Sequence, residues 1–242
     1  MKNNSKSTEL ITLNNDLITR QSNYFIESYP AQEFSVQELK IIEYIISQTG
    51  FKDLDLIKNK QNKEIEISVI DFSKMINANK TQIYRDANKI ANSLLCKKID
   101  FKYIDKKGLP AFIKKNFFAG VTYENGSITF EINHFALSYF VEIKEKFTEI
   151  NLKYIVEINS SYGIILYKLL KQYIKIGKRK FSIDELRKHF GLGENQYKLY
   201  SNFKKTLNTA IKNINENSDI NISFLEHKIG KSIKEITFII NN

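Results

Sequence analysis

The sequence predicts an α+β protein made of two tandem domains of the same design. Two stretches share one order of elements: a short capped helix, a turn, a longer amphipathic helix and a β-hairpin. Each short helix opens with a serine three residues before a carboxylate, at Ser68 and at Ser182, so the two starts lie 114 residues apart. Such a long-range repeat indicates a duplicated module, and this order of elements is that of a winged helix.

The two longer helices carry the same pattern of apolar residues at helical spacing. The matched pairs, each 120 residues apart, are Ile83 and Phe203, Ala87 and Leu207, Ile90 and Ala210, Ala91 and Ile211, and Leu94 and Ile214. Agreement along the whole length of both helices supports a duplication rather than one large mixed fold.

Each long helix is followed by residues that predict a β-hairpin, the wing. In the first copy, Asn125-Gly126 stands between two apolar runs, a strong signal for a two-residue hairpin turn. In the second copy, residues 220–225 and 233–240 are expected to be the paired strands. Both wings contain or adjoin lysines that could reach a phosphate backbone.

The domain boundary is expected near residue 146. The charge density rises between about residues 135 and 150, and Glu142, Lys144, Glu145 and Lys146 should lie on an exposed connecting helix. The N-terminal winged-helix domain would therefore cover residues 1–145 and the C-terminal one residues 146–242. Residues 1–8 are almost wholly polar, which predicts disorder.

Composition limits the classes of function. The chain has 242 residues, 42% of them hydrophobic, enough for a core in each of two domains. A net charge of +10 favours a polyanionic partner, although membrane-surface proteins can share this property. No apolar run reaches the roughly 18 residues that span a bilayer, and no signal peptide is evident, so we expect a cytoplasmic protein that has no membrane partner. The single cysteine, Cys96, excludes an internal disulfide and should be buried.

The faces opposite the two apolar stripes are polar and basic. The candidate DNA-binding residues are Thr81, Gln82, Arg85 and Lys89 on the first long helix, Lys198, Ser201, Asn202, Lys204, Lys205 and Lys212 on the second, and Lys228 and Lys231 in the second wing. Such side chains bind phosphates or base edges, and a helix that follows a short helix and a turn can enter the major groove. A single basic helix face is explained by ordinary exposure to solvent. Two helices whose basic faces occupy matching positions, each followed by a β-hairpin, favour binding in a DNA groove.

The sequence lacks the residue patterns that catalysis would need. A rolling-circle nickase uses a His-x-His metal site and a nucleophilic tyrosine, but His134, His189 and His227 are far apart in the chain. None of the 13 tyrosines has a motif around it. We therefore expect no enzyme activity, no metal site and no cofactor.

Several stretches carry the motifs of one known family. They are residues 13–18, 146–148, 152–155, 161–173 (SYGIILYKLLKQY), 181–186 and 197–215. In these the chain resembles the plasmid replication initiators of the Rep_3 type, iteron-binding proteins with two winged-helix domains. The similarity spans nearly the whole chain and is firmest in its second half. Family members often carry arginines after the phenylalanine of the second recognition helix, where this chain has Lys204 and Lys205; lysine lacks the planar fork for bidentate contacts with guanine.

The resemblance implies binding to direct repeats, the iterons, in double-stranded DNA at a plasmid origin. The second domain would read the major groove, and the first would hold the other end of the site. Monomers along the array would help to open AT-rich DNA and would recruit host replication-initiation and helicase-loading proteins. In some relatives a homodimer, joined through the N-terminal domain, represses the initiator's own promoter.

Two other functions compete with this one. A dimeric winged-helix transcription regulator would share both modules, but it would bind one inverted repeat rather than a series of direct repeats. An origin nickase would need metal-dependent cleavage with a covalent tyrosine link, and the missing His-x-His pair disfavours it. The DNA beside the gene distinguishes the initiator from the regulator.

Overall fold

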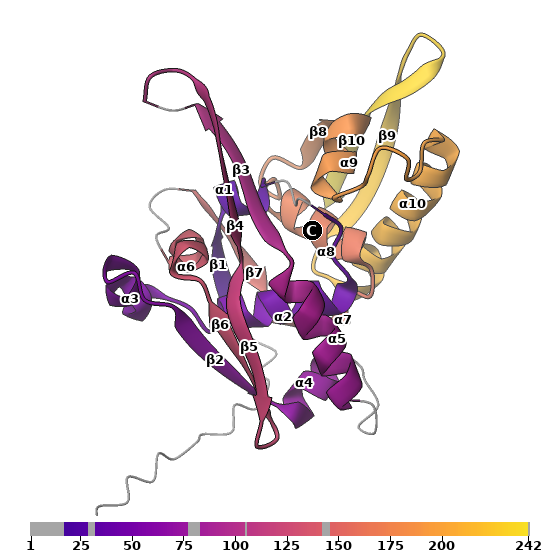
Figure 1. Cartoon of the computed structure of the whole chain (residues 1–242). Coiled ribbons are helices and arrows are strands. Elements are labelled where there is room, and N and C mark those ends of the chain that lie inside the picture. Colours follow the sequence, from indigo (N-terminus) through magenta and orange to yellow (C-terminus); the bar gives the residue numbers. More distant parts are fainter. Residues whose placement is uncertain (1–16, 29–31, 77–82, 105, 142–145, 242) are drawn as a thin grey trace, which may run out of the picture.

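The structure, a computed structural model, forms two α+β modules that pack side by side (Figure 1). It describes residues 17–28, 32–76, 83–104, 106–141 and 146–241. The stretch 1–8, for which the sequence predicts disorder, lies outside these residues.

The elements follow one another in an order that is largely repeated. The first module contains β1 (Ile18–Ser22), α1 (Asn23–Ile26), α2 (Val36–Ser47), η1 (Phe51–Asp53), α3 (Leu54–Lys58), β2 (Lys63–Ser68), α4 (Val69–Ile76), α5 (Ile83–Leu95), β3 (Lys98–Ile104), β4 (Pro110–Asn116), β5 (Phe118–Glu124), β6 (Ser127–Ile132) and α6 (His134–Val141). The second contains β7 (Phe147–Asn151), α7 (Leu152–Glu157), α8 (Ser161–Lys171), β8 (Lys178–Ser182), α9 (Ile183–His189), α10 (Tyr200–Asn217), β9 (Asn221–Ile229) and β10 (Ser232–Asn241).

Both modules are winged helices, which confirms the predicted fold class. The first has a three-stranded sheet of order β2-β6-β5, and the second has the order β8-β10-β9. All neighbouring strands are antiparallel. In each module the strand before the helix pair hydrogen-bonds to the last strand of the hairpin that follows it. The hairpin is therefore attached to its own helix pair and forms the wing.

The first module also carries a hairpin that the sequence analysis did not predict. β3 and β4 form a separate two-stranded sheet, paired from Lys98 opposite Asn116 to Ile104 opposite Pro110. It projects from the module, between α5 and β5 in the chain (Figure 1). Apolar and polar residues alternate along β3, as is typical of a strand, but β4 begins at a proline and ends in Lys-Lys-Asn, a composition that disfavours strands.

The duplication begins earlier in the chain than the sequence repeat suggested, at β1 and β7. These two strands pair antiparallel with Arg20 opposite Glu149 at the centre. Read in chain order, the first residue of β7 stands 129 positions after the first residue of β1, and the same offset holds along both strands. The amides of Asn23 and Leu152, which begin the next helices, each donate at 2.9 Å to the carbonyl just before the opposite strand. The ribbon is therefore locally two-fold symmetric, and it connects equivalent points of the two modules.

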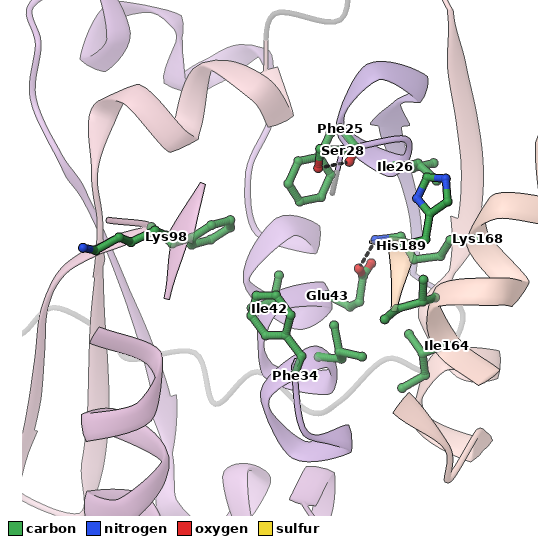
Figure 2. A pocket seen from close by; sticks show the side chains of 13 residues that line it. Phe25, Ile26, Ser28, Phe34, Ile42, Glu43, Lys98, Ile164, Lys168 and His189 are labelled. Carbon is green, nitrogen blue, oxygen red and sulfur yellow. Dashed lines mark hydrogen bonds and ion pairs between the residues drawn. The ribbon is translucent and has the colours of Figure 1, made fainter. Parts of the chain in front are cut away.

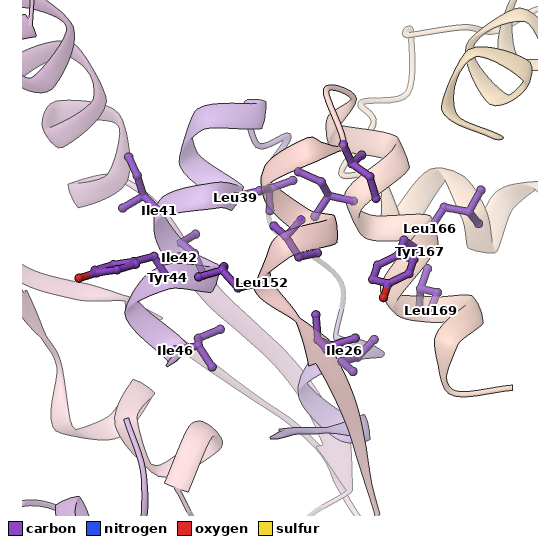
Figure 3. Close-up of a cluster of buried hydrophobic side chains, with 14 of the residues drawn as sticks. Ile26, Leu39, Ile41, Ile42, Tyr44, Ile46, Leu152, Leu166, Tyr167 and Leu169 are labelled. Atoms are coloured by element: carbon purple, nitrogen blue, oxygen red, sulfur yellow. The ribbon is translucent and has the colours of Figure 1, made fainter. Parts of the chain in front are cut away.

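Helix α2 is the element on which both modules pack. Nine of its twelve residues are buried, and it contacts α4 and α5 in the first module and α7 and α8 in the second. Figure 3 draws Ile42 of α2 in one buried cluster with Leu152 of α7 and Tyr167 of α8. A helix with this burial has no broad solvent face, so its polar side chains need partners inside the protein.

Charged side chains connect the two modules. Glu43 of α2 and Lys168 of α8 form a buried ion pair, and Gln21 of β1 donates to the second carboxylate oxygen of Glu43. Glu27, next to α1, accepts hydrogen bonds from both terminal nitrogens of Arg179 at 2.6 and 2.7 Å. Because an unpaired buried charge is costly, these pairs favour one arrangement of the modules.

A cavity of about 100 Å³ adjoins the Glu43–Lys168 pair, between the modules. Figure 2 shows Phe34 of the first module and Ile164 and His189 of the second among its lining side chains. The lining is mostly apolar, and the ion pair closes one side of it. The cavity is thus part of the contact between modules.

His189 is a buried titratable group at this contact. Its ring is buried, packs edge-on against Phe181 at 5.7 Å, and places Nε2 3.8 Å from a Glu27 carboxylate oxygen. Burial lowers the pKa of His189 to about 4; the charge of Glu27 opposes this effect and that of Arg179 adds to it.

Two local expectations are wrong. Residues 135–150 do not form one connecting helix, because α6 ends at Val141 and Phe147–Asn151 is strand β7; pairing with β1 overrides the local charge pattern. Cys96 is exposed rather than buried, since it follows the last residue of α5 and leaves the core there. The boundary near residue 146 stays a prediction, and β7 begins just after it.

The buried ion pair leads to a first prediction. Lys168→Met should lower the free energy of unfolding by about 3–5 kcal/mol, because it leaves Glu43 buried without its cation. Urea denaturation measures the change. Lys58→Met is the matched control: Lys58 pairs with Asp55 on the surface, with side chains 73% and 85% exposed, and its loss should cost less than about 1 kcal/mol. Equal losses for the two variants would contradict the structural role of the buried pair.

His189 predicts how stability depends on pH. Its folded-state pKa of about 4 lies below the ordinary value of 6.5, so the unfolded chain takes up a proton that the folded chain resists. Stability should therefore fall by about 3 kcal/mol as the pH decreases from 6.5 to 4. Denaturation at several pH values should show a shallower decline for His189→Gln than for the unmodified protein. Parallel declines would mean that other groups cause the loss.

Candidate nucleic-acid interface

Helix α10 is positioned by the apolar stripe that the sequence predicts. Phe203, Leu207 and Ile214 are fully buried, and the helix packs on α8 and β9. The opposite face is open to solvent and carries four of the candidate residues, Ser201, Asn202, Lys205 and Lys212. An exposed row of hydroxyl, amide and ammonium groups on a rigid helix is suited to contact DNA.

Arg187 of α9 organises the turn that leads into α10. Its guanidinium donates to the carbonyls of Tyr197 at 2.9 Å, Gly193 at 3.1 Å and Gln196 at 2.5 Å. Leu199, at the N-cap of α10, makes no side-chain capping bond. Arg187 therefore helps to fix the turn that leads into the helix, while the helix start itself has no side-chain cap. Sequence reasoning missed Arg187 because only the folded turn brings these carbonyls together.

Two candidate residues occupy positions that differ from the expectation. Lys198 is exposed, but it lies in the turn before α10 rather than on the helix. Lys204 lies on the helix, and its Nζ is 2.8 Å from Glu226 of β9 and 6.0 Å from the Phe224 ring. Hydrogen bonds from Lys204 and then from the Tyr200 hydroxyl lower the pKa of the Glu226 carboxyl, so this group stays ionised.

The second wing is longer than expected. β9 and β10 stay paired up to Ile229 opposite Ser232, so the connection is only Gly230-Lys231, with Gly230 at a φ of +64°. Lys228 and Lys231 are both exposed at this tip. The register therefore brings two candidate lysines to the end of the hairpin.

The first module presents fewer described candidates. Arg85 and Lys89 are exposed on α5, whereas Thr81 and Gln82 lie outside the described residues. Lys89 also lines a cleft between α5 and the start of α2, together with Glu38. The exposed side of α5 is thus basic, as the sequence predicts for Arg85 and Lys89.

The first wing has the predicted turn. Asn125 and Gly126 adopt φ values of +50° and +75°, the left-handed conformations that a tight hairpin of this kind requires. On the strand before the turn, the ring of Tyr123 packs edge-on against that of Tyr84 at the start of α5, with centroids 5.1 Å apart. Wing and helix are in direct side-chain contact.

Metal and membrane features are not found in the described part of the chain. No group of three or more His, Cys, Asp or Glu side chains gathers there in a way that could hold a metal ion. His134, His189 and His227 belong to α6, α9 and β9. Of the described helices, none is at once long and apolar enough to span a membrane.

Two family models match the chain in succession. The model for initiator replication proteins, WH1, matches residues 18–171, and the model for initiator Rep proteins, WH2, matches residues 182–240. The chain belongs to the family of initiator replication proteins. This confirms the resemblance seen in the sequence. The WH1 match extends through α8, and the WH2 match begins at Ser182, the last residue of β8.

One solved structure shares the fold of this initiator over nearly its full length. The crystal structure of the Pi initiator protein in complex with iteron DNA matches with a TM-score of 0.69 and 19% identity, covering 95% of this chain and 99% of that one. Domains 2 and 3 of RctB match at a TM-score of 0.49 and 10% identity, over 87% and 83% of the two chains. The WH1 domain of a replication protein isolated from a multiple sclerosis patient matches at 0.30 and 8%, over 43% and 76%. Of these, the Pi structure shares the fold over nearly the full length.

The role of Arg187 can be tested by substitution. Arg187→Met should lower the free energy of unfolding by about 2 kcal/mol, because charge-assisted hydrogen bonds to the turn are lost. It should also speed hydrogen exchange in residues 193–197, measured by mass spectrometry. Lys188→Met, at the exposed next position, is the control and should leave both quantities nearly unchanged. Unchanged exchange in Arg187→Met would show that the turn is held by other contacts.

Proposed function

We propose that this initiator binds directly repeated sites, the iterons, in the double-stranded DNA of a plasmid origin and thereby starts replication. The observation that carries the proposal is the exposed polar and basic face of α10 in a WH2 domain whose family consists of replication initiators. The similar fold of a protein solved in complex with iteron DNA supports the same DNA class.

The interface would consist of two recognition helices and a wing. From α5 it would use Arg85 and Lys89, with Thr81 and Gln82 ahead of the helix. From the second module it would use Lys198, Ser201, Asn202, Lys205 and Lys212, and from the wing tip Lys228 and Lys231. The net charge of +10 supports phosphate binding, because each neutralised phosphate releases counterions.

The proposed action needs no catalytic step and no cofactor. Favourable binding at several adjacent sites would offset the free-energy cost of bending the origin and opening its AT-rich part. Amide and hydroxyl groups such as Asn202 and Ser201 would discriminate bases, whereas the lysines would set affinity. The role is thus one of assembly on DNA.

Partners beyond DNA belong to the same proposal. Host replication-initiation and helicase-loading proteins would join the open complex. A homodimer through the N-terminal domain, residues 1–145, would act at the initiator's own promoter. The projecting β3–β4 hairpin supports such a contact, because Leu109 and Phe112 are 58% and 67% exposed there. Phe112 lies on β4, which pairs only with β3 among the described strands, and Leu109 lies in the turn just before it; exposed apolar side chains at a sheet edge suit pairing with a second chain.

A footprint on the DNA flanking the gene tests the proposal. The purified protein should protect evenly spaced direct repeats beside an AT-rich tract, at two salt concentrations, with weaker protection at the higher one. One symmetric inverted repeat would favour a dimeric regulator. Metal-dependent cleavage with a covalent tyrosine link would favour a nickase.

Substitutions connect the footprint to the helix. Lys205→Ala and Lys198→Ala should each lower affinity, and each should reduce the slope of log K against log salt by about 0.9 if the lysine neutralises one phosphate. Lys58→Ala on α3, which lies on the far side of the molecule from α10, is the matched control (Figure 1). Equal effects in a band-shift titration would argue against α10 as the interface.

A further inference from the structure

In each module, one of the contacts between recognition helix and wing is made by the residue at the same helix position. Tyr84 of α5 packs edge-on against Tyr123 of β5, at 78° between the rings. Lys204 of α10 forms an ion pair with Glu226 of β9 at 2.8 Å. Tyr84 and Lys204 are equivalent, because the apolar positions of the two helices match at an offset of 120 residues.

The register of the first sheet defines the place of Tyr123. Tyr123 of β5 lies opposite Ile128 of β6, and Ile128 lies opposite Ile67 of β2. Ile67 is buried and stands directly before Ser68, the residue that opens the short helix. Tyr123 is therefore two strands across the sheet from the residue that precedes the helix cap.

The second sheet has the same row. Glu226 of β9 lies opposite Ile236 of β10, and Ile236 lies opposite Phe181 of β8. Phe181 is buried and stands directly before Ser182, the N-cap of the short helix. Glu226 thus occupies the position that Tyr123 has in the first module. Tyr84 and Lys204 therefore occupy equivalent helix positions, and Tyr123 and Glu226 occupy equivalent wing positions, although one contact is aromatic and the other ionic.

We propose that the Tyr84–Tyr123 and Lys204–Glu226 contacts are one device, a brace that sets the angle between recognition helix and wing, and that Lys204 is a positioning residue rather than a phosphate ligand. The proposal rests on the proposed DNA-binding function. It separates Lys204 from its neighbour Lys205, which lies on the exposed side of the same helix.

The surroundings of Lys204 support a bracing role. The Tyr200 hydroxyl, one helical turn earlier, donates to the same Glu226 oxygen that pairs with the Lys204 ammonium. Two helix residues therefore hold one wing carboxylate. The Lys204 side chain is 41% exposed and that of Glu226 is 27% exposed, so the pair is partly shielded from solvent. A carboxylate so close to the ammonium would also repel a phosphate approaching it.

A brace of this kind has a clear mechanical purpose. A helix in the major groove and a wing on the flanking backbone contact DNA together only at one relative angle. The aromatic contact of the first module does not depend on charge, whereas the ion pair of the second is screened by salt. The wing of the second module should therefore lose its orientation first when salt rises.

Glu226→Gln gives opposite results for the two roles of Lys204. If the pair is a brace, this variant should bind a short duplex of unselected sequence up to about fivefold more weakly, as should Lys204→Met. If Lys204 instead binds phosphate, removal of the competing carboxylate should tighten binding, and this would overturn the proposal. Fluorescence anisotropy of a labelled duplex measures both variants.

Two further measurements complete the test: the salt dependence of binding, and the recovery of affinity in a double variant. Lys204→Met should leave the slope of log K against log salt unchanged, whereas Lys205→Met should reduce it by about 0.9. The double variant Lys204→Tyr with Glu226→Tyr keeps the net charge and copies the first module, so it should restore affinity. A reduced slope for Lys204→Met, or no rescue by the tyrosine pair, would overturn the brace.

Failure of the brace can be told apart from failure of DNA binding. If the unmodified protein binds no duplex, the proposed function fails, and the brace is judged from urea denaturation alone. There, Lys204→Met and Glu226→Gln should show a non-additive effect on the unfolding midpoint. Strict additivity of the two substitutions would mean that the side chains do not act together, and the proposal would fall.

Discussion

The pairing of β1 with β7 is the constraint on which the remaining architecture depends. It joins equivalent points of the two modules, and Arg20 and Glu149 face each other at its centre at 3.1 Å. From there each chain segment enters a short helix and then a longer one, α2 or α8, which pack against each other. The relative placement of the two winged helices therefore depends on a ribbon of five residue pairs, on the packing of α2 against α7 and α8, and on the Glu27–Arg179 pair.

That helix contact is polar as well as apolar. Glu43 and Lys168 are buried among isoleucines and leucines of α2 and α8, and Glu43 is also bonded to β1 through Gln21. A buried ion pair adds little net stability compared with apolar packing, but a shifted arrangement would leave both charges without partners. The pair thus contributes to the choice of one orientation, which would matter if both α5 and α10 engage one stretch of DNA as proposed.

The two copies have kept their topology and changed their details. The first module has gained the β3–β4 hairpin, whereas the second has a wing whose strands are nine and ten residues long. The link between recognition helix and wing is aromatic in one and ionic in the other. A shared backbone register with exchanged side-chain chemistry is what duplication followed by specialisation of each copy would leave.

Much of the fold could be predicted from the sequence because its signals are local. The serine-capped short helices, the amphipathic spacing of α5 and α10 and the Asn125-Gly126 turn all act within a few residues. The family, too, could be recognised from linear motifs. The polar face of α10 was predictable for the same reason, since a helix of known phase fixes which residues point away from its apolar stripe.

Only the tertiary structure decided the rest, because it depends on residues far apart in the chain. β7 is a strand because it meets β1, more than a hundred residues earlier, and not because of its own charges. β4 exists because β3 offers it a partner. Arg187 and Glu226 have roles only once the turn and the wing lie against their helices. Residue type and spacing determined which helices could face DNA, whereas long-range pairing determined what holds them in place.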